Sequence, residues 1–232
     1  MASRLKKTMI PKPFILLIGV LTSCAPFGQS KPAATSAQLR RVVLVHGFLE
    51  TGSTFALLQD RLENQGVKCI VPRLIPSDGR GGLKKLAEGL KRDIDAAYGT
   101  EEPISIVAFS MGGIVSRYYL QNLGGAKRCE TLITVASPHH GTKAAYIYPS
   151  QGAEEMRPGS RFLSDLQQSE SNLGNMKVIS YRTRLDLIIL PSTSSIWERA
   201  ENIEHPSLLH PLLLTSPKVL KDIERRILES ES

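Results

Sequence analysis

The sequence has few cysteines and no long apolar run. Cysteine occurs at only three of its 232 positions, 24, 69 and 129, which excludes a small domain held together by many disulfides. The apolar run near the N-terminus, Phe14–Leu21, is far shorter than the roughly 20 residues that a membrane-spanning helix needs. Internal repeats are also absent, so a repeat architecture is excluded.

Acidic residues are missing from the first 23 positions. The four basic residues of that segment, Arg4, Lys6, Lys7 and Lys12, therefore contribute more than half of the formal net charge of +7. Without them the 29 basic residues fall to 25 against 22 acidic ones, a net charge of about +3. This charge is too small and too dispersed to indicate nucleic-acid binding.

The N-terminal segment has the pattern of an export signal. A basic start, the apolar run and the small residues Thr22-Ser23 precede Cys24, and together they predict a signal peptide over residues 1–23. Leu21-Thr22-Ser23-Cys24 also resembles the lipobox of bacterial lipoproteins, in which the cysteine becomes the new N-terminus and carries acyl chains. Residues 24–39 would then be a flexible tether to the membrane of the cell envelope. Cleavage after Thr35-Ser36-Ala37, giving a periplasmic or secreted protein, is the alternative.

Residues 40–232 are predicted to form one domain. The chain is 41% apolar and 22% charged, which is ordinary for a globular protein with one sizeable core. Short apolar runs alternate with amphipathic segments, which predicts an α/β fold with a mainly parallel sheet of about six strands and helices on both faces. The clear strands are Arg41–Val45, Val67–Val71, Ile104–Phe109, Thr131–Ala136 and Met176–Tyr181. The expected helices are Ser53–Gln65 (capped by Ser53), Gly82–Tyr98, Met111–Leu123, Ser160–Gln168 and Pro217–Leu228.

Ala108-Phe109-Ser110-Met111-Gly112 lies between a predicted strand and a predicted helix. A serine in such a sharp turn is exposed as a nucleophile, and the residues two before and two after it must be small. Ala108 and Gly112 satisfy that requirement, although the usual pattern has glycine at both positions. Ser110 is therefore the predicted nucleophile.

The end of the first strand carries Val45-His46-Gly47-Phe48. This turn resembles the one that, in α/β hydrolases, positions the backbone N–H of the following residue, here Phe48, to donate with that of Met111 into an oxyanion hole. His46 is expected to shape this turn and not to act as the base.

An acid and a base are expected after the serine in chain order. Asp186 follows the last clear strand, and only His205 and His210 lie beyond it. His205 and His210 are the two candidates for the base. The predicted triad is Ser110, Asp186 and His210, because the resemblance described next favours His210, and His205 is the alternative.

These segments resemble the α/β-hydrolase superfamily, in particular small bacterial lipases and esterases. Asp186-Leu-Ile-Ile-Leu-Pro191 and His210-Pro-Leu-Leu-Leu-Thr-Ser216 are similar to the acid and histidine loops of lipases. Ala136-Ser-Pro-His-His-Gly-Thr142 and Arg157–Leu166 are also similar to segments of GPI inositol-deacylase-like proteins. The resemblance runs from about Val42 to Leu228 and implies a minimal version of the fold, without the two N-terminal strands of larger members.

The resemblance also implies the order of the strands. Two strands would separate Cys69 from Cys129, or about 14 Å, whereas a disulfide tolerates about 7 Å between Cα atoms. Both cysteines are therefore expected to be buried thiols. A metal site at His139 and His140 is disfavoured, because adjacent side chains diverge and no carboxylate lies near them in the sequence.

The function expected from this resemblance is hydrolysis of carboxylic esters of lipids, without a cofactor and by a monomer. The apolar side chains of Phe48, Phe109 and Met111 are expected to bind the acyl chain. A thioesterase or an acyltransferase could use the same triad. A non-catalytic binding protein of the same fold is the alternative from another class.

Overall fold

The computed structural model describes residues 39–206 and 209–229, which belong to one compact unit. The predicted signal peptide, Cys24 and the tether up to residue 38 lie outside the described residues, so lipidation and export stay predictions. In the described segments, no helix combines the length and the apolar character that crossing a membrane requires.

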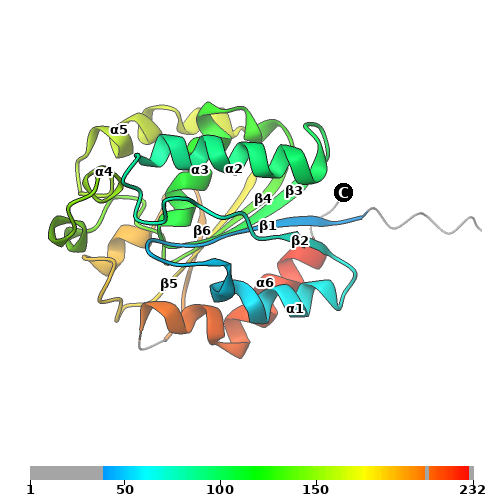
Figure 1. The fold of residues 1–232 in the computed structure, drawn as a ribbon. Helices are drawn as coiled ribbons and strands as arrows, with labels where there is room; N and C mark the ends of the chain where they lie inside the picture. Colours follow the sequence, from blue (N-terminus) through cyan, green and yellow to red (C-terminus); the bar gives the residue numbers. More distant parts are fainter. Residues whose placement is uncertain (1–38, 207–208, 230–232) are drawn as a thin grey trace, which may run out of the picture. The chain divides into compact units, whose positions relative to one another are not determined.

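A six-stranded sheet forms the centre of the unit, in the order β2-β1-β3-β4-β5-β6, and every neighbouring pair is parallel (Figure 1). The predicted α/β fold is confirmed. β1 and β3 are buried along nearly their whole length, because their β-branched and aliphatic side chains are covered on both faces of the sheet. The strands are β1 (Arg41–Val45), β2 (Lys68–Ile70), β3 (Ile104–Phe109), β4 (Cys129–Val135), β5 (Lys177–Arg182) and β6 (Glu201–Glu204).

Helices cover both faces of the sheet (Figure 1). On one face lie α2 (Leu83–Tyr98), α3 (Met111–Asn122) and α5 (Arg161–Gln168), and on the other lie α1 (Ala56–Glu63) and α6 (Pro217–Glu229). The short helix α4 (Gln151–Glu155) belongs to the long connection after β4. The remaining helical turns are 3₁₀: Gly52–Phe55, Gly125–Lys127, Lys143–Ile147, Glu170–Leu173, Ser192–Ser195 and His210–Thr215.

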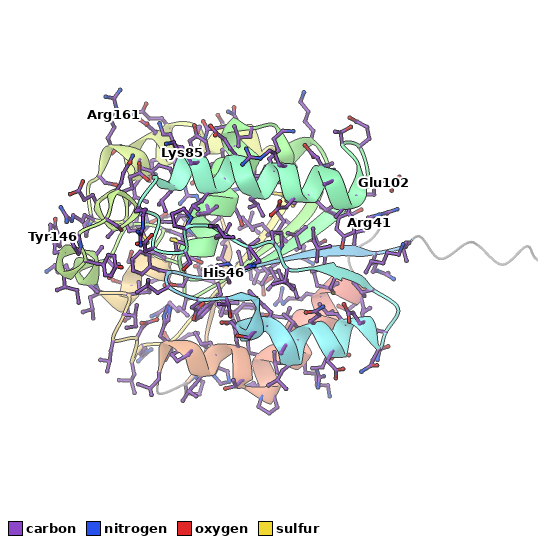
Figure 2. All side chains as sticks on the ribbon, in the orientation of Figure 1. Arg41, His46, Lys85, Glu102, Tyr146 and Arg161 are labelled. Carbon is purple, nitrogen blue, oxygen red and sulfur yellow. The ribbon has the colours of Figure 1, made fainter. Side chains whose placement is uncertain are left out.

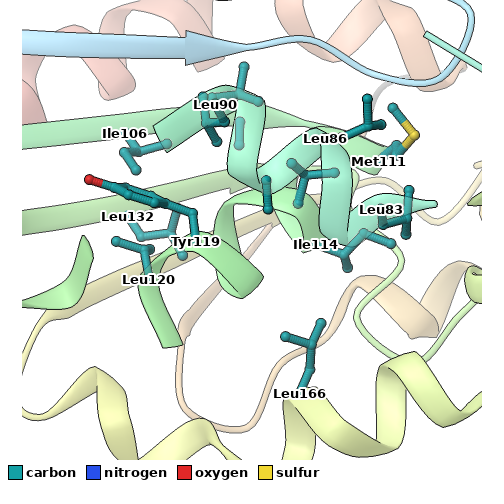
Figure 3. Packing of buried hydrophobic residues seen from close by; sticks show 14 of the residues in the cluster. Leu83, Leu86, Leu90, Ile106, Met111, Ile114, Tyr119, Leu120, Leu132 and Leu166 are labelled. Atoms are coloured by element: carbon teal, nitrogen blue, oxygen red, sulfur yellow. The ribbon is translucent and has the colours of Figure 1, made fainter. Parts of the chain in front are cut away.

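Two hydrophobic clusters form the core, one on each face of the sheet. Figure 3 shows part of the first, where Leu86 and Leu90 of α2 pack with Ile106 of β3 and Leu132 of β4. The apolar residues of α2 recur at helical spacing, and Leu83, Leu86, Leu90 and Ile94 are all buried, as in a helix with one face in the core. The same holds in α1, where Leu58 and Leu62 are buried.

One expectation about the elements was wrong, and the sixth strand was not located by the sequence. Ser53 does not cap α1, because the chain first makes a 3₁₀ turn, Gly52–Phe55, and the hydroxyl of Ser53 bonds to that of Thr51. β6 has no counterpart among the clear predicted strands. As an edge strand with mostly exposed residues, it lacks the apolar run by which a buried strand is recognised.

The cysteines agree with the expected strand order, but only Cys129 is buried as expected. Cys69 is half-buried, because it lies on the edge strand β2. β1 and β3 separate Cys69 of β2 from Cys129 of β4, and both thiols are free. Burial raises the pKa of each thiol to about 12. Both thiols therefore stay protonated and unreactive at neutral pH.

Candidate active site

Ser110, His210 and Phe48 meet at the carboxyl ends of the strands, around a cavity of about 450 Å³, and Asp186 is bound to His210. Ser110 and His210 line this cavity, and most of its wall is apolar. In Figure 2 His46 lies at the end of β1, and Tyr146 marks the connection after β4 on the same side of the molecule. The apolar wall includes Phe48, Leu49, Ala145, Ile147, Met156 and Ile188.

Ser110 occupies the sharp turn between β3 and α3. Its φ of 52° is in the left-handed region, which a non-glycine residue occupies only when the surroundings enforce it. Its N–H donates to the carbonyl of Val135 on β4 (2.9 Å), and its carbonyl accepts the N–H of Gly113 (3.0 Å). These bonds fix the strained turn and leave the side chain at the cavity wall.

His210 and Asp186 form a buried pair. Nδ1 of His210 lies 2.7 Å from Oδ2 of Asp186, and Oδ1 accepts the N–H groups of Ile188 (2.9 Å) and Ile189 (2.8 Å). The carboxylate is thus held on both oxygens. Since it accepts the Nδ1 proton, it favours the tautomer in which Nε2 is a free base.

His205 takes no part in this pair. Its Nε2 lies 3.2 Å from the hydroxyl of Ser216, and its N–H donates to the carbonyl of Arg182 at the end of β5. Of the two histidines left open by the sequence, His210 is the one that the structure brings to Asp186. The ring of Phe109 packs against that of His210, with centroids 4.7 Å apart.

The turn after β1 contains the predicted oxyanion donor. Nδ1 of His46 lies 3.0 Å from the carbonyl of Gly47, and Nε2 accepts the N–H of Leu74 (3.0 Å). His46 is therefore a neutral imidazole that joins two loops, and burial lowers its pKa. The N–H of Phe48 makes no hydrogen bond to another described residue, and that of Met111 begins α3, where a helix has no internal acceptor.

The side chains of Phe109 and Met111 lie away from the cavity, which differs from the expected acyl contacts. Both are fully buried in the core, and Figure 3 shows Met111 among the residues of the first cluster. The reason is geometric, because a residue next to Ser110 in sequence points back into the sheet or helix packing. Phe48 does line the cavity, and its ring packs edge-on against Tyr148 at 5.0 Å.

His139 belongs to a buried cluster behind the turn after β4. Its Nε2 donates to the hydroxyl of Thr134 (3.1 Å), and Nδ1 faces the guanidinium of Arg117 at 3.4 Å. Burial places its pKa well below the ordinary value. Among the described residues no three His, Cys, Asp or Glu side chains are grouped as a metal ion would require.

Thr142 links two of the loops that resemble lipase segments. Its hydroxyl donates to the carbonyl of Ile188 (2.6 Å) and accepts the N–H of Leu190 (2.9 Å). The turn after β4 thereby holds the loop that carries Asp186. The preceding Gly141 has a φ of +87°, and a Cβ there would lie 2.6 Å from the nitrogen of Pro158, so glycine is required at this position.

One further polar residue of the cavity was missed by the sequence reasoning. Glu50 lines the wall beside Ser110, and its Oε2 accepts the N–H of Gly47 (2.9 Å). Its position four residues after His46 was the only available signal. Without that signal, a glutamate in a loop is expected to be exposed to solvent.

The parallel sheet, the serine turn after its third strand and the His–Asp pair at its carboxyl edge define an α/β-hydrolase. Residues 41–176, more than half of the chain, match the model of the family described as palmitoyl protein thioesterase. The chain belongs to that family, and it is an ester-hydrolysing enzyme in this broad sense. The matched region contains Ser110 and ends before Asp186 and His210. A sequence search among curated proteins found no match.

Solved structures with the same fold include several named hydrolases. The mature form of Bacillus licheniformis lipase BlEst2 has a TM-score of 0.69 at 15% identity, over 82% of this chain and 93% of that one. Aspergillus fumigatus lipase B has a TM-score of 0.69 at 14% identity, over 86% and 55%. The ydeN gene product of B. subtilis has a TM-score of 0.60 at 16% identity, over 82% of this chain and 98% of that one. At these identities the likeness establishes the fold.

Proposed function

We propose that the protein hydrolyses esters of long acyl chains through a covalent acyl-enzyme on Ser110. The observation that carries this proposal is the apolar cavity in whose wall Ser110 and His210 both lie, with His210 bound to Asp186. A strained serine, a neutral histidine base and a buried carboxylate are the three groups that nucleophilic acyl transfer needs.

The reaction proceeds in two steps. His210 Nε2 takes the proton of Ser110 as Oγ attacks the ester carbonyl, and the imidazolium then gives that proton to the departing alcohol. In the second step His210 takes a proton from the water that attacks the acyl carbonyl. It returns this proton to Oγ of Ser110 as the carboxylic acid leaves. Asp186 keeps the imidazole oriented and stabilises its charged form.

The N–H groups of Phe48 and Met111 donate hydrogen bonds to the negatively charged oxygen of the tetrahedral intermediate. Both belong to the turns that flank Ser110, and α3 begins at Met111, so the positive end of the helix dipole is added there. Removing one such donor typically costs about 3 kcal/mol of transition-state stabilisation.

The surface around the cavity supports an acyl substrate. Nearly all the large apolar side chains that are exposed in the described residues come from loops that follow the carboxyl ends of strands, and they include Leu49 and Ile147 at the cavity itself. Exposed apolar area gathered at one site marks a binding surface for apolar ligands. Lipid esters are the preferred substrates. Acyl thioesters are the second candidate, since the chain belongs to the palmitoyl protein thioesterase family.

The test starts from protein that begins after Cys24. A fluorophosphonate probe should label Ser110, as identified by mass spectrometry of the modified peptide. p-Nitrophenyl esters from C2 to C16 and palmitoyl-CoA, followed by free-thiol release, then rank oxygen esters against thioesters. Longer chains should be preferred because of the apolar wall.

Two variants serve as controls. Ser110→Ala should lower turnover by several orders of magnitude, and Asp186→Asn by roughly 10³- to 10⁴-fold, because it favours the wrong tautomer of His210. Intact activity in Ser110→Ala would refute the proposed nucleophile. Absence of labelling in folded protein would favour the non-catalytic binding protein, and esters formed with added alcohols would identify an acyltransferase.

A further inference from the structure

The turn after β1 is under backbone strain and is held by several polar contacts. Leu49 has a φ of 57°, a left-handed conformation that disfavours a side chain with a Cβ. Its N–H donates to the carbonyl of Ser77 (3.0 Å), and the N–H of Gly47 donates to Oε2 of Glu50 (2.9 Å). The carboxylate of Glu50 therefore closes the turn that contains Phe48, the residue proposed as an oxyanion donor.

Glu50 also lies next to the reacting groups. A Cβ built on Gly47 would be 2.8 Å from Oε2 of Glu50 and 3.0 Å from Cβ of Ser110, so the carboxylate and the serine flank the same point. Glu50 is half-buried and shares the cavity wall with His210. It is thus an acidic group inside a largely apolar wall, on a different loop from Asp186.

The groups that face Glu50 are few. Burial raises its pKa, and the N–H of Gly47, the charge of His210 and the hydroxyl of Thr54 act in the opposite direction. His46 belongs to the same turn and is held neutral, and Asp186 reaches the cavity only through His210. His210 is therefore the titratable partner of Glu50 in the site.

We propose that Glu50 is a positioning residue of this active site: its carboxylate holds the turn that presents the N–H of Phe48 to Ser110, and its charge stabilises the imidazolium of His210. The inference rests on the proposed function. It assigns two effects to one side chain, and they can be separated. The hydrogen bond to Gly47 needs only an acceptor oxygen, whereas the effect on His210 needs a negative charge.

The sign of the charge effect follows from this arrangement. The charge of His210 acts to lower the pKa of Glu50, so opposite charges on the two groups stabilise each other, and the acidic limb of kcat/KM depends on both groups. Because Glu50 and His210 interact, that limb reports the pair and not one group. Removing the charge should move the limb to lower pH.

The experiment compares Glu50→Gln, Glu50→Ala and Glu154→Gln with the wild type on a short, soluble ester. Glu50→Gln keeps an acceptor for Gly47, so kcat on the pH plateau should stay within about 3-fold of the wild type while the acidic limb moves down by about 0.3 pH unit or more. Glu50→Ala loses the acceptor as well, and kcat should fall by roughly 10-fold or more with KM changed less than about 3-fold. Glu154 is exposed on α4, so its variant should leave the limb and kcat unchanged.

The result that overturns the inference is an acidic limb that does not move in Glu50→Gln, or wild-type kcat in Glu50→Ala. Thermal unfolding of each variant excludes loss of folded protein as the cause. Ser110→Ala, measured in parallel, separates the two proposals. If Ser110→Ala retains activity, the proposed function fails. If it is inactive while both Glu50 variants behave as the wild type, only the role of Glu50 fails.

Discussion

Gly112, two residues after Ser110, has no side chain because backbone atoms surround it. A Cβ on Gly112 would lie 2.3 Å from the carbonyl oxygen of Val45 and 2.6 Å from that of His46, distances at which real Cβ atoms do not occur. The end of β1 therefore packs directly on the first turn of α3. This contact also fixes the distance between the two predicted oxyanion donors, since Phe48 follows that strand and Met111 begins that helix.

Gly112→Ala should consequently lose both stability and activity. We expect it to lower the free energy of unfolding by about 2 kcal/mol or more, as overpacking against the backbone does, and to reduce fluorophosphonate labelling of Ser110. Gly89→Ala is the matched control. A Cβ there meets only a side-chain nitrogen of Arg92 at 3.7 Å, so alanine should stabilise α2 by about 0.5–1 kcal/mol. Urea unfolding of both variants measures the difference, and equal effects would contradict the packing explanation.

At the scale of single residues the sequence predicts chemistry better than it predicts surroundings. The A-x-S-x-G pattern singles out Ser110 because the turn restricts its neighbours. Phe109 was expected at the substrate and lies in the core, because adjacency in sequence does not give the direction of a side chain. Glu50 was not predicted, because only the folded turn shows that its carboxylate accepts the N–H of Gly47 and shares a cavity wall with His210.

At the scale of elements, α2 depends on a cap supplied by another helix. Its first position follows Gly82, which has no side chain to accept the free N–H groups of the first turn. Instead, the N–H of Leu83 donates to Oε2 of Glu155, the last residue of α4. The carboxylate also lies at the positive end of the α2 dipole.

Glu155→Ala should therefore destabilise the protein by about 1 kcal/mol, the usual cost of losing a cap. Glu154→Ala is the control. It removes an exposed carboxylate from the neighbouring position and should change stability by less than about 0.5 kcal/mol. Chemical denaturation of the two variants checks this, and hydrogen exchange should show faster exchange in the first turn of α2 for Glu155→Ala alone. Identical denaturation midpoints would show that the cap contributes nothing.

The elements most accurately predicted are those that are buried on both sides. β1 and β3 have the predicted bounds because a continuous β-branched run has few other stable placements. β6 was missed because Ile203 is its only large apolar residue, and it is held by pairing with β5. The sequence could not predict the capping of α2 by Glu155 either, since this contact depends on how α4 packs.

At the scale of the whole molecule, two buried neutral histidines should make stability depend on pH. Burial lowers the pKa of His46 and of His139 below the ordinary value of 6.5. Below that pH the unfolded chain binds protons that the folded chain does not, so their contribution is complete above about pH 6.5 and is lost as the pH falls. Each histidine adds a slope of up to about 1.4 kcal/mol per pH unit.

Urea unfolding at pH 7.5, 6.5 and 5.5 measures this effect. We expect the wild type to lose stability between pH 6.5 and 5.5. His139→Gln should lower stability at pH 7.5, because it disturbs the contacts with Thr134 and Arg117, and it should flatten the decline. His140→Gln removes an exposed imidazole that is the smallest of the three causes lowering the pKa of His139, so it should change the slope much less than His139→Gln. A wild-type profile that is flat down to pH 5.5 would contradict the assignment of neutral histidines.

The parallel sheet gives the domain two unlike ends. The described chain enters at the start of β1, and the cavity opens at the opposite edge, beyond the strand ends (Figure 1). A second cavity, lined mainly by polar residues such as Lys91, Asp95 and Arg128, lies at the entry side. A domain attached to a solid support directly before β1 would therefore turn the face that carries the cavity toward the flowing liquid, and a bulky fusion partner joined at residue 39 would leave that cavity unobstructed.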